Sequence, residues 1–356
     1  MTRFRVRAAV FLVTVVLGCT ALGCTAAAAP ALAATALATT KVSAPTRPQA
    51  ASGWLARQMV KGSHFVTVFD GVTYPAQGET IDAILAFAAT KSANGYGERA
   101  IGWLEGSSVR SNYIGAGTES YAGATAKLAL AAEVRGVNPA KFGPVNLIAR
   151  LAKLLAKSGR YSDHSAFGDF SNAFSQSLAI IALSRHGGAP AKAVTFLISS
   201  ECKNGGYPLD FGQKTCVSDT DSTALAAEAL LAAGHRAAAD RGLWWLAQVQ
   251  QSNGGLDAVG GTRPNANTTG LAGQAFAAAG WFRPAARAKK FLTSLQVGCS
   301  APSAQRGALT YDSTGFAAST AVDATAQGIL GLADVSLAKL SAKGSAGGAP
   351  RLACSS

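Results

Sequence analysis

Residues 244–256, WWLAQVQQSNGGL, contain the pattern that determines the fold. An aromatic–leucine pair opens the segment, an amphipathic helical stretch follows, and Asn-Gly-Gly closes it. Glycine favours the left-handed conformation that ends helices, so this segment predicts a helix with a defined stop. The aromatic–leucine pair recurs at Trp54, Trp103, Phe196 and Phe291. The chain therefore contains internal repeats.

The spacing of these pairs sets the period of the repeat. Counted with Trp245, the intervals are 49, 93, 49 and 46 residues, and LIARLAKLLAKSG around Leu151 fills the long one. Six units of about 47 residues result, a period typical of helical-hairpin repeats. Each unit has an amphipathic first helix, a polar loop, and a second helix rich in Ala and Leu, as in TALAAEALLAAG.

The second helices indicate how the hairpins are arranged. They are apolar nearly all round, which is typical of helices buried on every side, whereas the first helices carry Lys, Arg and Gln on one face. An inner ring of buried helices within an outer ring of amphipathic helices is an α/α toroid. We predict an all-α, single-domain fold of six hairpins over residues 52–338, between a linker at 34–51 and a flexible Gly/Ser/Ala tail at 339–356.

The repeat sequences resemble those of a known superfamily. WWLAQVQQSNGGL and FLTSLQ are similar to the repeats of squalene and hopene cyclases and of protein prenyltransferase β subunits. The chain is thus identified as a member of the terpenoid cyclase/prenyltransferase α/α-toroid superfamily, over about residues 53–334. That superfamily also includes the cobalamin carriers intrinsic factor and transcobalamin. The resemblance is specific for the fold and says little about activity.

The N-terminal sequence predicts export. A basic stretch with Arg3, Arg5 and Arg7 precedes a short apolar run and an Ala-x-Ala site, so residues 1–33 are predicted to be a secretory signal peptide. Lipid anchoring at Cys19 or Cys24 is the less favoured alternative. We expect a secreted or cell-surface protein.

The remaining cysteines and the charge fit an exported protein. Cys202, Cys216, Cys299 and Cys354 stay after cleavage, and an even number predicts two disulfides, Cys202 with Cys216 and Cys299 with Cys354. The net charge is +13, but the basic residues are scattered and lack interleaved aromatic side chains. We therefore expect no nucleic-acid partner.

The segment DTDSTA, residues 219–224, permits two interpretations. By resemblance to the Asp-x-Asp-Asp motif of class II terpene cyclases, Asp221 would be a general acid, although Ser222 replaces the last aspartate. The more economical interpretation is that Asp221 caps a buried helix. Asn267 and Asp323 stand at similar places in later repeats, which favours capping.

Other polar residues are candidates for a ligand site. Glu228 and Gln274 each lie five residues after a threonine of the capping region, Thr223 and Thr269, on neighbouring inner helices. They therefore either bond to each other or form a polar spot in a ligand cavity. Tyr207 lies in the disulfide-closed loop, predicted to be at the barrel mouth. The candidate ligand-binding residues are Tyr207, Asp219, Asp221, Asn267, Asp323, Glu228 and Gln274.

Two functions are predicted. The first is binding of an apolar or amphipathic small molecule at the barrel mouth, a corrinoid being the best single candidate because the exported proteins that the chain resembles carry one. The alternative is a cyclase-type or prenyltransferase-like enzyme with Asp221 as acid. No cofactor is required, and no metal is expected, because the prenyltransferase Asp-x-Cys pair is missing. A membrane transporter or a second binding domain is a further candidate partner, and a monomer is expected.

Overall fold

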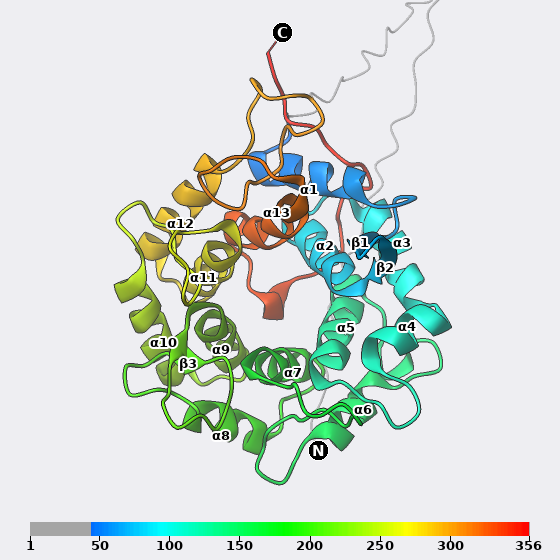
Figure 1. The fold of residues 1–356 in the computed structure, drawn as a ribbon, viewed down its shortest axis with the longest axis vertical. Coiled ribbons are helices and arrows are strands. Elements are labelled where there is room, and N and C mark those ends of the chain that lie inside the picture. The colour runs from blue at the N-terminus through cyan, green and yellow to red at the C-terminus, as the bar shows by residue number, and fades with distance from the viewer. Residues whose placement is uncertain (1–43, 356) are drawn as a thin grey trace, which may run out of the picture. The chain divides into compact units, whose positions relative to one another are not determined.

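The structure is a computed structural model that describes residues 44–355. The predicted signal peptide, with Cys19 and Cys24, lies outside the described residues. Six α-helices form a closed inner ring, in which each helix packs against the next and α13 packs against α2 (Figure 1). In ring order they are α2 (Gln77–Thr90), α5 (Ala122–Arg135), α7 (Ala173–Arg185), α9 (Thr220–Ala232), α11 (Ala266–Ala278) and α13 (Ala318–Ala333).

A second layer of helices surrounds this ring. Each outer helix packs on one or two inner helices, as α12 does on α11 and α13. They are α1 (Arg47–Gln58), α3 (Asn94–Glu105), α6 (Leu147–Leu154), α8 (Ala191–Ser199), α10 (Arg236–Val249) and α12 (Phe282–Ser294), with α4 (Ser107–Ile114) added after α3. The predicted six-hairpin α/α toroid is confirmed.

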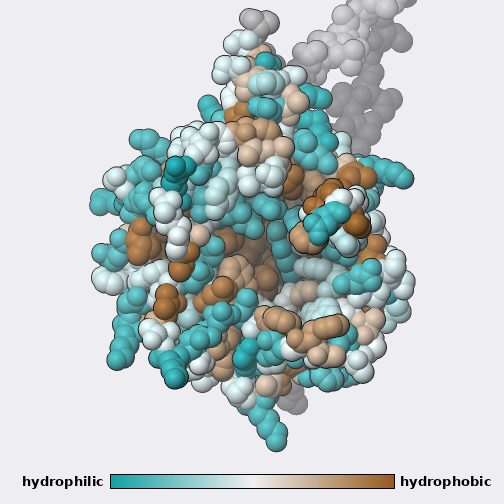
Figure 2. All heavy atoms as spheres, in the orientation of Figure 1, coloured by the Kyte–Doolittle hydropathy of each residue, from teal (hydrophilic) through white to brown (hydrophobic). Residues whose placement is uncertain are grey.

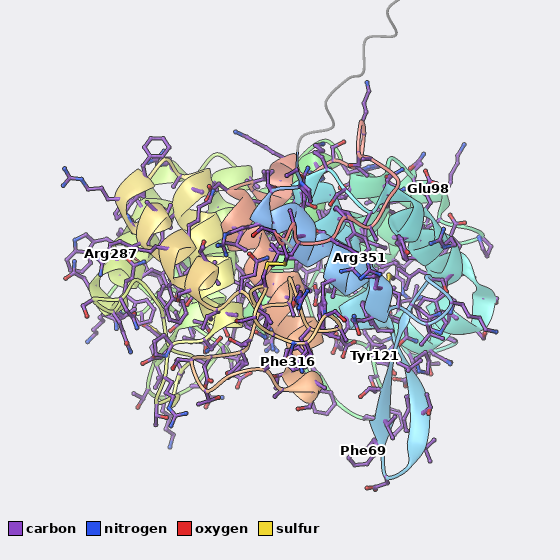
Figure 3. The ribbon with its side chains drawn as sticks, turned by 90° about the horizontal axis from the view of Figure 1, so that it is seen from above. Phe69, Glu98, Tyr121, Arg287, Phe316 and Arg351 are labelled. Carbon is purple, nitrogen blue, oxygen red and sulfur yellow. A yellow bond between two sulfur atoms is a disulfide. The ribbon has the colours of Figure 1, made fainter. Side chains whose placement is uncertain are left out.

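Short elements occupy the connections between these helices. A β-hairpin, β1 (Phe65–Phe69) paired with β2 (Val72–Ala76), projects from the helices with Phe69 at its tip (Figure 3). A second pair joins β3 (Tyr207–Pro208) to β4 (Ser218–Asp219), and two 3₁₀ turns complete the elements, η1 (Pro139–Lys141) and η2 (Leu337–Lys339).

Glycine and glutamine join α10 to the repeat that follows it. Gly254, with positive φ, lies so close to α12 that a Cβ there would collide with the carbonyl of Arg287. The Gln250 side chain donates both to the Gly254 carbonyl and to the Pro284 carbonyl of that helix, at 2.9 and 3.0 Å. The Asn-Gly-Gly stop that reveals the repeat in the sequence is thus also the joint between repeats.

The same joint closes the ring between the last repeat and the first. Gln296 donates to the Gly307 carbonyl at 3.1 Å and to the Arg47 carbonyl of α1 at 2.9 Å. A closed ring has no unpaired terminal repeat, so every apolar inner helix is buried between two neighbours.

The toroid begins earlier than the sequence predicts. Thr46 caps α1 in a capping box, in which its hydroxyl accepts from the Gln49 N–H and the Gln49 side chain accepts from the Thr46 N–H. Pro48 in the first turn also favours this helix start. Residues 47–51 are therefore helix, and the predicted linker boundary at residue 51 is wrong.

The predicted flexible tail is also corrected. Residues 335–350, here called the C-terminal strap, follow α13 and cross the C-terminal ends of the inner helices, where Figure 1 shows them across the hole of the ring. The strap bonds through its backbone to Val134 at the end of α5 and to Lys91 and Ala93 after α2. Its Gly and Ala residues allow close approach, and Gly53 on α1 has no side chain because Pro350 occupies the space.

Candidate functional site

The inner helices share one contact that sets their height in the ring. The hydroxyl oxygens of Thr80, Thr223, Thr269 and Thr325 each accept a backbone N–H from the preceding loop, at 2.8 to 3.0 Å. In α7 the side-chain oxygen of Gln176 does the same at 2.8 Å. These five residues therefore occupy equivalent positions, here called the ring position, on five of the inner helices.

The ring encloses a lumen that is open at the N-terminal ends of the inner helices. On most of these helices two half-buried residues flank the ring position. One lies two residues before it and the other two residues after it, and most residues between them are buried. Residues four apart share a face of a helix, so this stripe faces the lumen. Figure 2 shows the hollow at the centre of this face, with apolar side chains inside it.

One wall of the lumen is apolar. Phe174 and Leu178 on α7, Leu225 on α9 and Leu271 on α11 occupy the stripe on three consecutive helices. Below them the side chain of Ile181 is fully buried. This side of the lumen can hold a hydrocarbon group.

The facing wall is polar and charged. Asp323 and Gln327 of α13, Asp82 of α2 and Lys127 of α5 occupy the same stripe. The Lys127 ammonium lies 2.7 Å from the Asp82 carboxylate, and the two side chains are 22% and 17% exposed. Burial lowers the pKa of Lys127, but the Asp82 charge opposes it and the pKa is raised above its ordinary value.

Asp323 stands next to this ion pair. Burial raises the pKa of its carboxyl to about 6, and the Glu79 and Asp82 carboxylates add to the rise, against Lys127. The Tyr113 phenol is close enough to the same group of charges that they affect its pKa, which burial raises to about 12. The polar wall is therefore a coupled group of charges at the lumen.

Asp219, not Asp221, caps α9. The Asp219 carboxylate accepts from the Ser222 N–H at 2.7 Å. Asp221 is the second residue of the helix, and its Oδ1 is buried without a hydrogen-bond partner among the described residues. Burial raises the Asp221 pKa to about 6, Thr268 opposes this, and Asp219 adds to it. The capping interpretation favoured for Asp221 is thus wrong.

Asn267 repeats this arrangement on the next helix. Asn265 caps α11 by accepting from the Thr268 N–H at 2.9 Å. Asn267, two residues on, carries a buried Oδ1 with no partner among residues 44–355. Asp221, Asn267 and Asp323 each stand two residues before a ring-position threonine, so all three lie on the lumen stripe of consecutive helices.

Glu228 and Gln274 do not bond to each other and do not line the open lumen. Glu228 is 1% exposed and accepts from the Ser336 hydroxyl at 2.7 Å, while Gln274 donates to the Val335 carbonyl. Burial raises the Glu228 pKa to about 8, against the hydrogen bonds from Ser336 and Leu337. These residues hold the C-terminal strap, which forms the floor of the lumen.

Tyr207 is buried and does not line the lumen. Its side chain is fully buried, with Cε2 3.5 Å from the place of a Cβ at Gly242 on α10. Its backbone N–H donates to the Thr223 hydroxyl, as the Leu256 N–H donates to the Thr269 hydroxyl in the next repeat. Tyr207 is a packing residue of the repeat, and its prediction as a ligand contact is wrong.

The disulfides form as predicted. Cys202 bonds to Cys216, and Cys299 bonds to Cys354. Within the described residues, no group of His, Cys, Asp and Glu side chains is arranged to hold a metal ion. No helix in that part of the chain is long and apolar enough to cross a membrane.

Sequence reasoning missed the charges of the polar wall. Asp82 and Lys127 interrupt the apolar helices TIDAILAFAA and TAKLALAA. A charge inside a helix otherwise apolar on every side is costly unless it is paired, so each of these sequences contained a signal of a paired or functional group. The pairing itself depends on the packing of α2 against α5.

Comparisons with known proteins support the fold. No family model and no curated protein matches the chain. A protein from Actinoplanes superimposes with a TM-score of 0.61 at 15% identity, over 81% of this chain and 98% of that one. Type II terpene cyclase MstE from Scytonema gives 0.59 at 13%, over 81% and 96%. An unsaturated glucuronyl hydrolase specific for heparin gives 0.57 at 10%, over 81% and 95%.

These neighbours share the helical architecture and differ in chemistry. MstE has also been solved with its substrate, geranylgeranyl dihydroxybenzoate, in a structure that superimposes with a TM-score of 0.54 at 13% identity, over 82% of this chain and 96% of that one. The chain has the α/α-toroid fold that the repeats predict, and MstE shares this fold. At these identities the similarity describes the fold alone.

Proposed function

We propose that the lumen binds an amphipathic small molecule. The observation that carries this proposal is the division of the stripe into two walls. Below Asp221 and Asn267 at its mouth, one wall is apolar on α7, α9 and α11, and the other is charged on α13, α2 and α5. A purely apolar ligand would displace water from the polar groups of the second wall without offering them hydrogen bonds, which is costly. A purely polar ligand would gain no free energy from burying the apolar side chains of the first wall.

The open end of the lumen gives such a molecule a route in. The C-terminal strap blocks the other end through Ser336 and Leu337, both of which are buried. Large exposed apolar side chains lie in the loops that lead into the inner helices, among them Phe69, Phe167 and Phe170. An apolar chain therefore meets apolar side chains before it reaches the lumen.

The test is a calorimetric titration with three probes. Geranylgeranyl dihydroxybenzoate combines an apolar chain with a polar head, cyanocobalamin represents the corrinoid prediction, and squalene in a detergent carrier has no polar head. We expect saturable binding of an amphipathic probe and a weaker response to squalene. Leu271→Gln, on the apolar wall, should weaken binding by about tenfold, because a buried apolar contact contributes about 1 to 3 kcal/mol.

The control is Val249→Gln, which changes an exposed apolar residue on α10 outside the lumen. Its affinity should equal that of the unchanged protein. The proposal is wrong if no probe binds, or if both variants weaken binding equally.

A second candidate function is general-acid catalysis by Asp221, and the orphaned Oδ1 favours it. A carboxyl with a pKa of about 6 keeps its proton in about one molecule in ten at pH 7, far more often than an ordinary aspartate, so a protonated form is available to donate to a bound alkene. In a cyclisation the proton is added at one alkene carbon and another is lost at the end, so the product has the mass of the substrate.

Incubation with geranylgeranyl dihydroxybenzoate followed by chromatography and mass spectrometry separates the two functions. A new peak of unchanged mass that disappears in Asp221→Asn and persists in Asp219→Asn supports the acid. Saturable binding without a new peak supports a carrier.

A further inference from the structure

A groove on the outer flank of the toroid lies away from the lumen. It has a volume of about 430 Å³ and lies between the Asn-Gly-Gly turn after α8 and the exposed face of α10. Two indole side chains, Trp244 and Trp281, line it together with polar and charged side chains. None of these residues belongs to the inner helices.

Trp244 is exposed without a structural reason. Its side chain is 57% exposed, whereas Trp245 beside it packs toward the interior against the turn at Gly206. Arg241 lies against Gly205 as Arg287 lies against Gly254, so the two arginines occupy equivalent positions in neighbouring repeats. Trp244 and Lys290 each lie three residues after these arginines, so Trp244 is equivalent to Lys290. An indole at this position is therefore not required by the repeat, and a large exposed apolar surface is commonly a binding surface.

The second indole, of Trp281, is fixed by a hydrogen bond. The Trp281 Nε1–H donates to Asp240 Oδ1 at 3.2 Å, and the Asp240 carboxylate also accepts from Arg236 at 2.8 to 2.9 Å. A side chain fixed by a hydrogen bond loses little conformational entropy when a ligand packs against it.

The polar groups of the groove balance in charge. Arg241 donates three hydrogen bonds of 2.6 to 2.9 Å to the Glu201 carboxylate, which fixes both side chains. The other lining charges, Asp240 and Lys203, are again one of each sign. A groove without net charge does not select an anion or a cation, but its fixed donors and acceptors suit hydroxyl groups.

We propose that this groove binds a neutral sugar ring of a glycan. The C–H face of a pyranose carries slight positive charge and lies flat on the negative face of an indole, which Trp244 offers to solvent. The ring's hydroxyl groups then bond to Asp240, to Arg241 and to the side-chain amide of Asn204, which also lines the groove. This site is separate from the lumen and does not depend on the function proposed for it.

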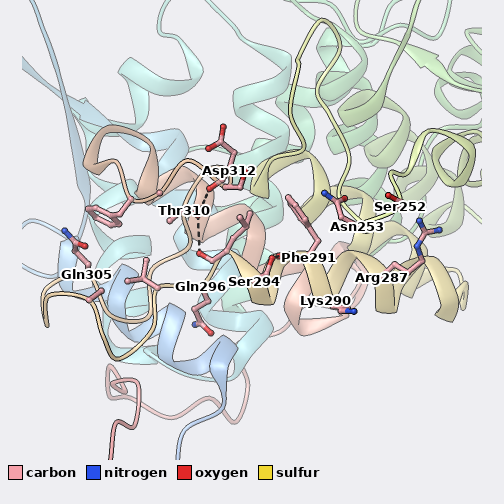
Figure 4. A pocket seen from close by; sticks show the side chains of 16 residues that line it. Ser252, Asn253, Arg287, Lys290, Phe291, Ser294, Gln296, Gln305, Thr310 and Asp312 are labelled. Atoms are coloured by element: carbon pink, nitrogen blue, oxygen red, sulfur yellow. Dashed lines mark hydrogen bonds between the residues drawn. The ribbon is translucent and has the colours of Figure 1, made fainter.

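The neighbouring groove has different chemistry. It lies one repeat further on, has a volume of about 820 Å³, and is lined by Lys290, Arg287 and many amide and hydroxyl groups (Figure 4). Of its two rings, Phe291 is only 6% exposed, and Phe316 is half-buried and packs edge-on against Trp54. The Arg287 guanidinium bonds to the Gln251 carbonyl. This groove therefore offers a ligand no indole as exposed as Trp244.

The experiment is a titration of the protein with chitohexaose and cellohexaose as neutral probes and hexagalacturonate as an acidic one. We expect a saturable change in tryptophan fluorescence with at least one neutral probe, with a Kd of about 1 mM or below. Trp244→Ala should lower that affinity at least tenfold, measured by calorimetry, and Trp244→Phe should restore part of it.

The matched control is Tyr74→Ala, which removes another exposed aromatic ring, 46% exposed, from β2 in a different repeat. It should leave the affinity unchanged. Since both rings are exposed to solvent, the thermal midpoints should also be unchanged. The proposal fails if neither neutral probe binds, if Trp244→Ala binds as tightly as the unchanged protein, or if the acidic probe binds more tightly than the neutral ones.

Discussion

The buried carboxyl of Glu228 predicts a pH-dependent stability. Its pKa is raised to about 8 by burial under the strap, while in the unfolded chain it would be near 4.3. Between these values the unfolded chain has lost the proton that the folded chain keeps. The folded state is therefore fully favoured below about pH 4, and loses stability as the pH rises toward 8, at about 1.4 kcal/mol per pH unit.

Glu228→Gln removes this titration and keeps a neutral group of the same size beside Ser336. The stability difference between the variant and the unchanged protein should then shift by about 4 kcal/mol in favour of the variant between pH 5 and pH 8. The measurement is the urea unfolding midpoint with the disulfides intact, at pH 5, 6, 7 and 8.

Glu98→Gln is the control for this experiment, since the Glu98 side chain is 65% exposed. Its midpoints should run parallel to those of the unchanged protein. If Glu228→Gln also runs parallel at all four pH values, the carboxyl titrates normally and the account of the strap as a sealed floor is wrong.

Three further substitutions test the fold and the site. Asp219→Ala should lower the free energy of unfolding by about 1 kcal/mol through loss of the α9 cap, whereas Asp221→Asn should not, by urea unfolding. Gln296→Ala removes two hydrogen bonds at the ring closure and should cost about 2 kcal/mol in the same assay. Gly53→Val places a side chain where the strap lies, so limited proteolysis should cleave the strap faster than in the unchanged protein.

The fold could be predicted because it is repeated. A helix stop such as Asn253-Gly254-Gly255 is ambiguous once, but its recurrence with the aromatic–leucine pair at a fixed interval identifies hairpins, and the apolar second helices place them inside. The disulfides followed from the cysteine count and from the short loop that joins Cys202 to Cys216.

The site could be predicted only in part. The sequence indicates Asp221 as a candidate acid, but Asp219 has the capping role, because the helix begins at Thr220, two residues earlier than a cap at Asp221 would place it. Glu228 was recognised as a buried carboxyl, but its partner Ser336 is 108 residues away. Contacts at such sequence separation depend on how the ring closes, and composition alone made the strap look flexible.

Repetition also separates structure from function within this chain. A residue that recurs at one position in several repeats, such as Thr223 and its equivalents, has a bond that every repeat needs. Trp244 on the flank has no such structural duty at its position, and the fold gains nothing evident from its side chain. Replacing it should therefore change what the protein binds more than how stably it folds, and the lumen and the flank groove can be tested separately because they share no residue.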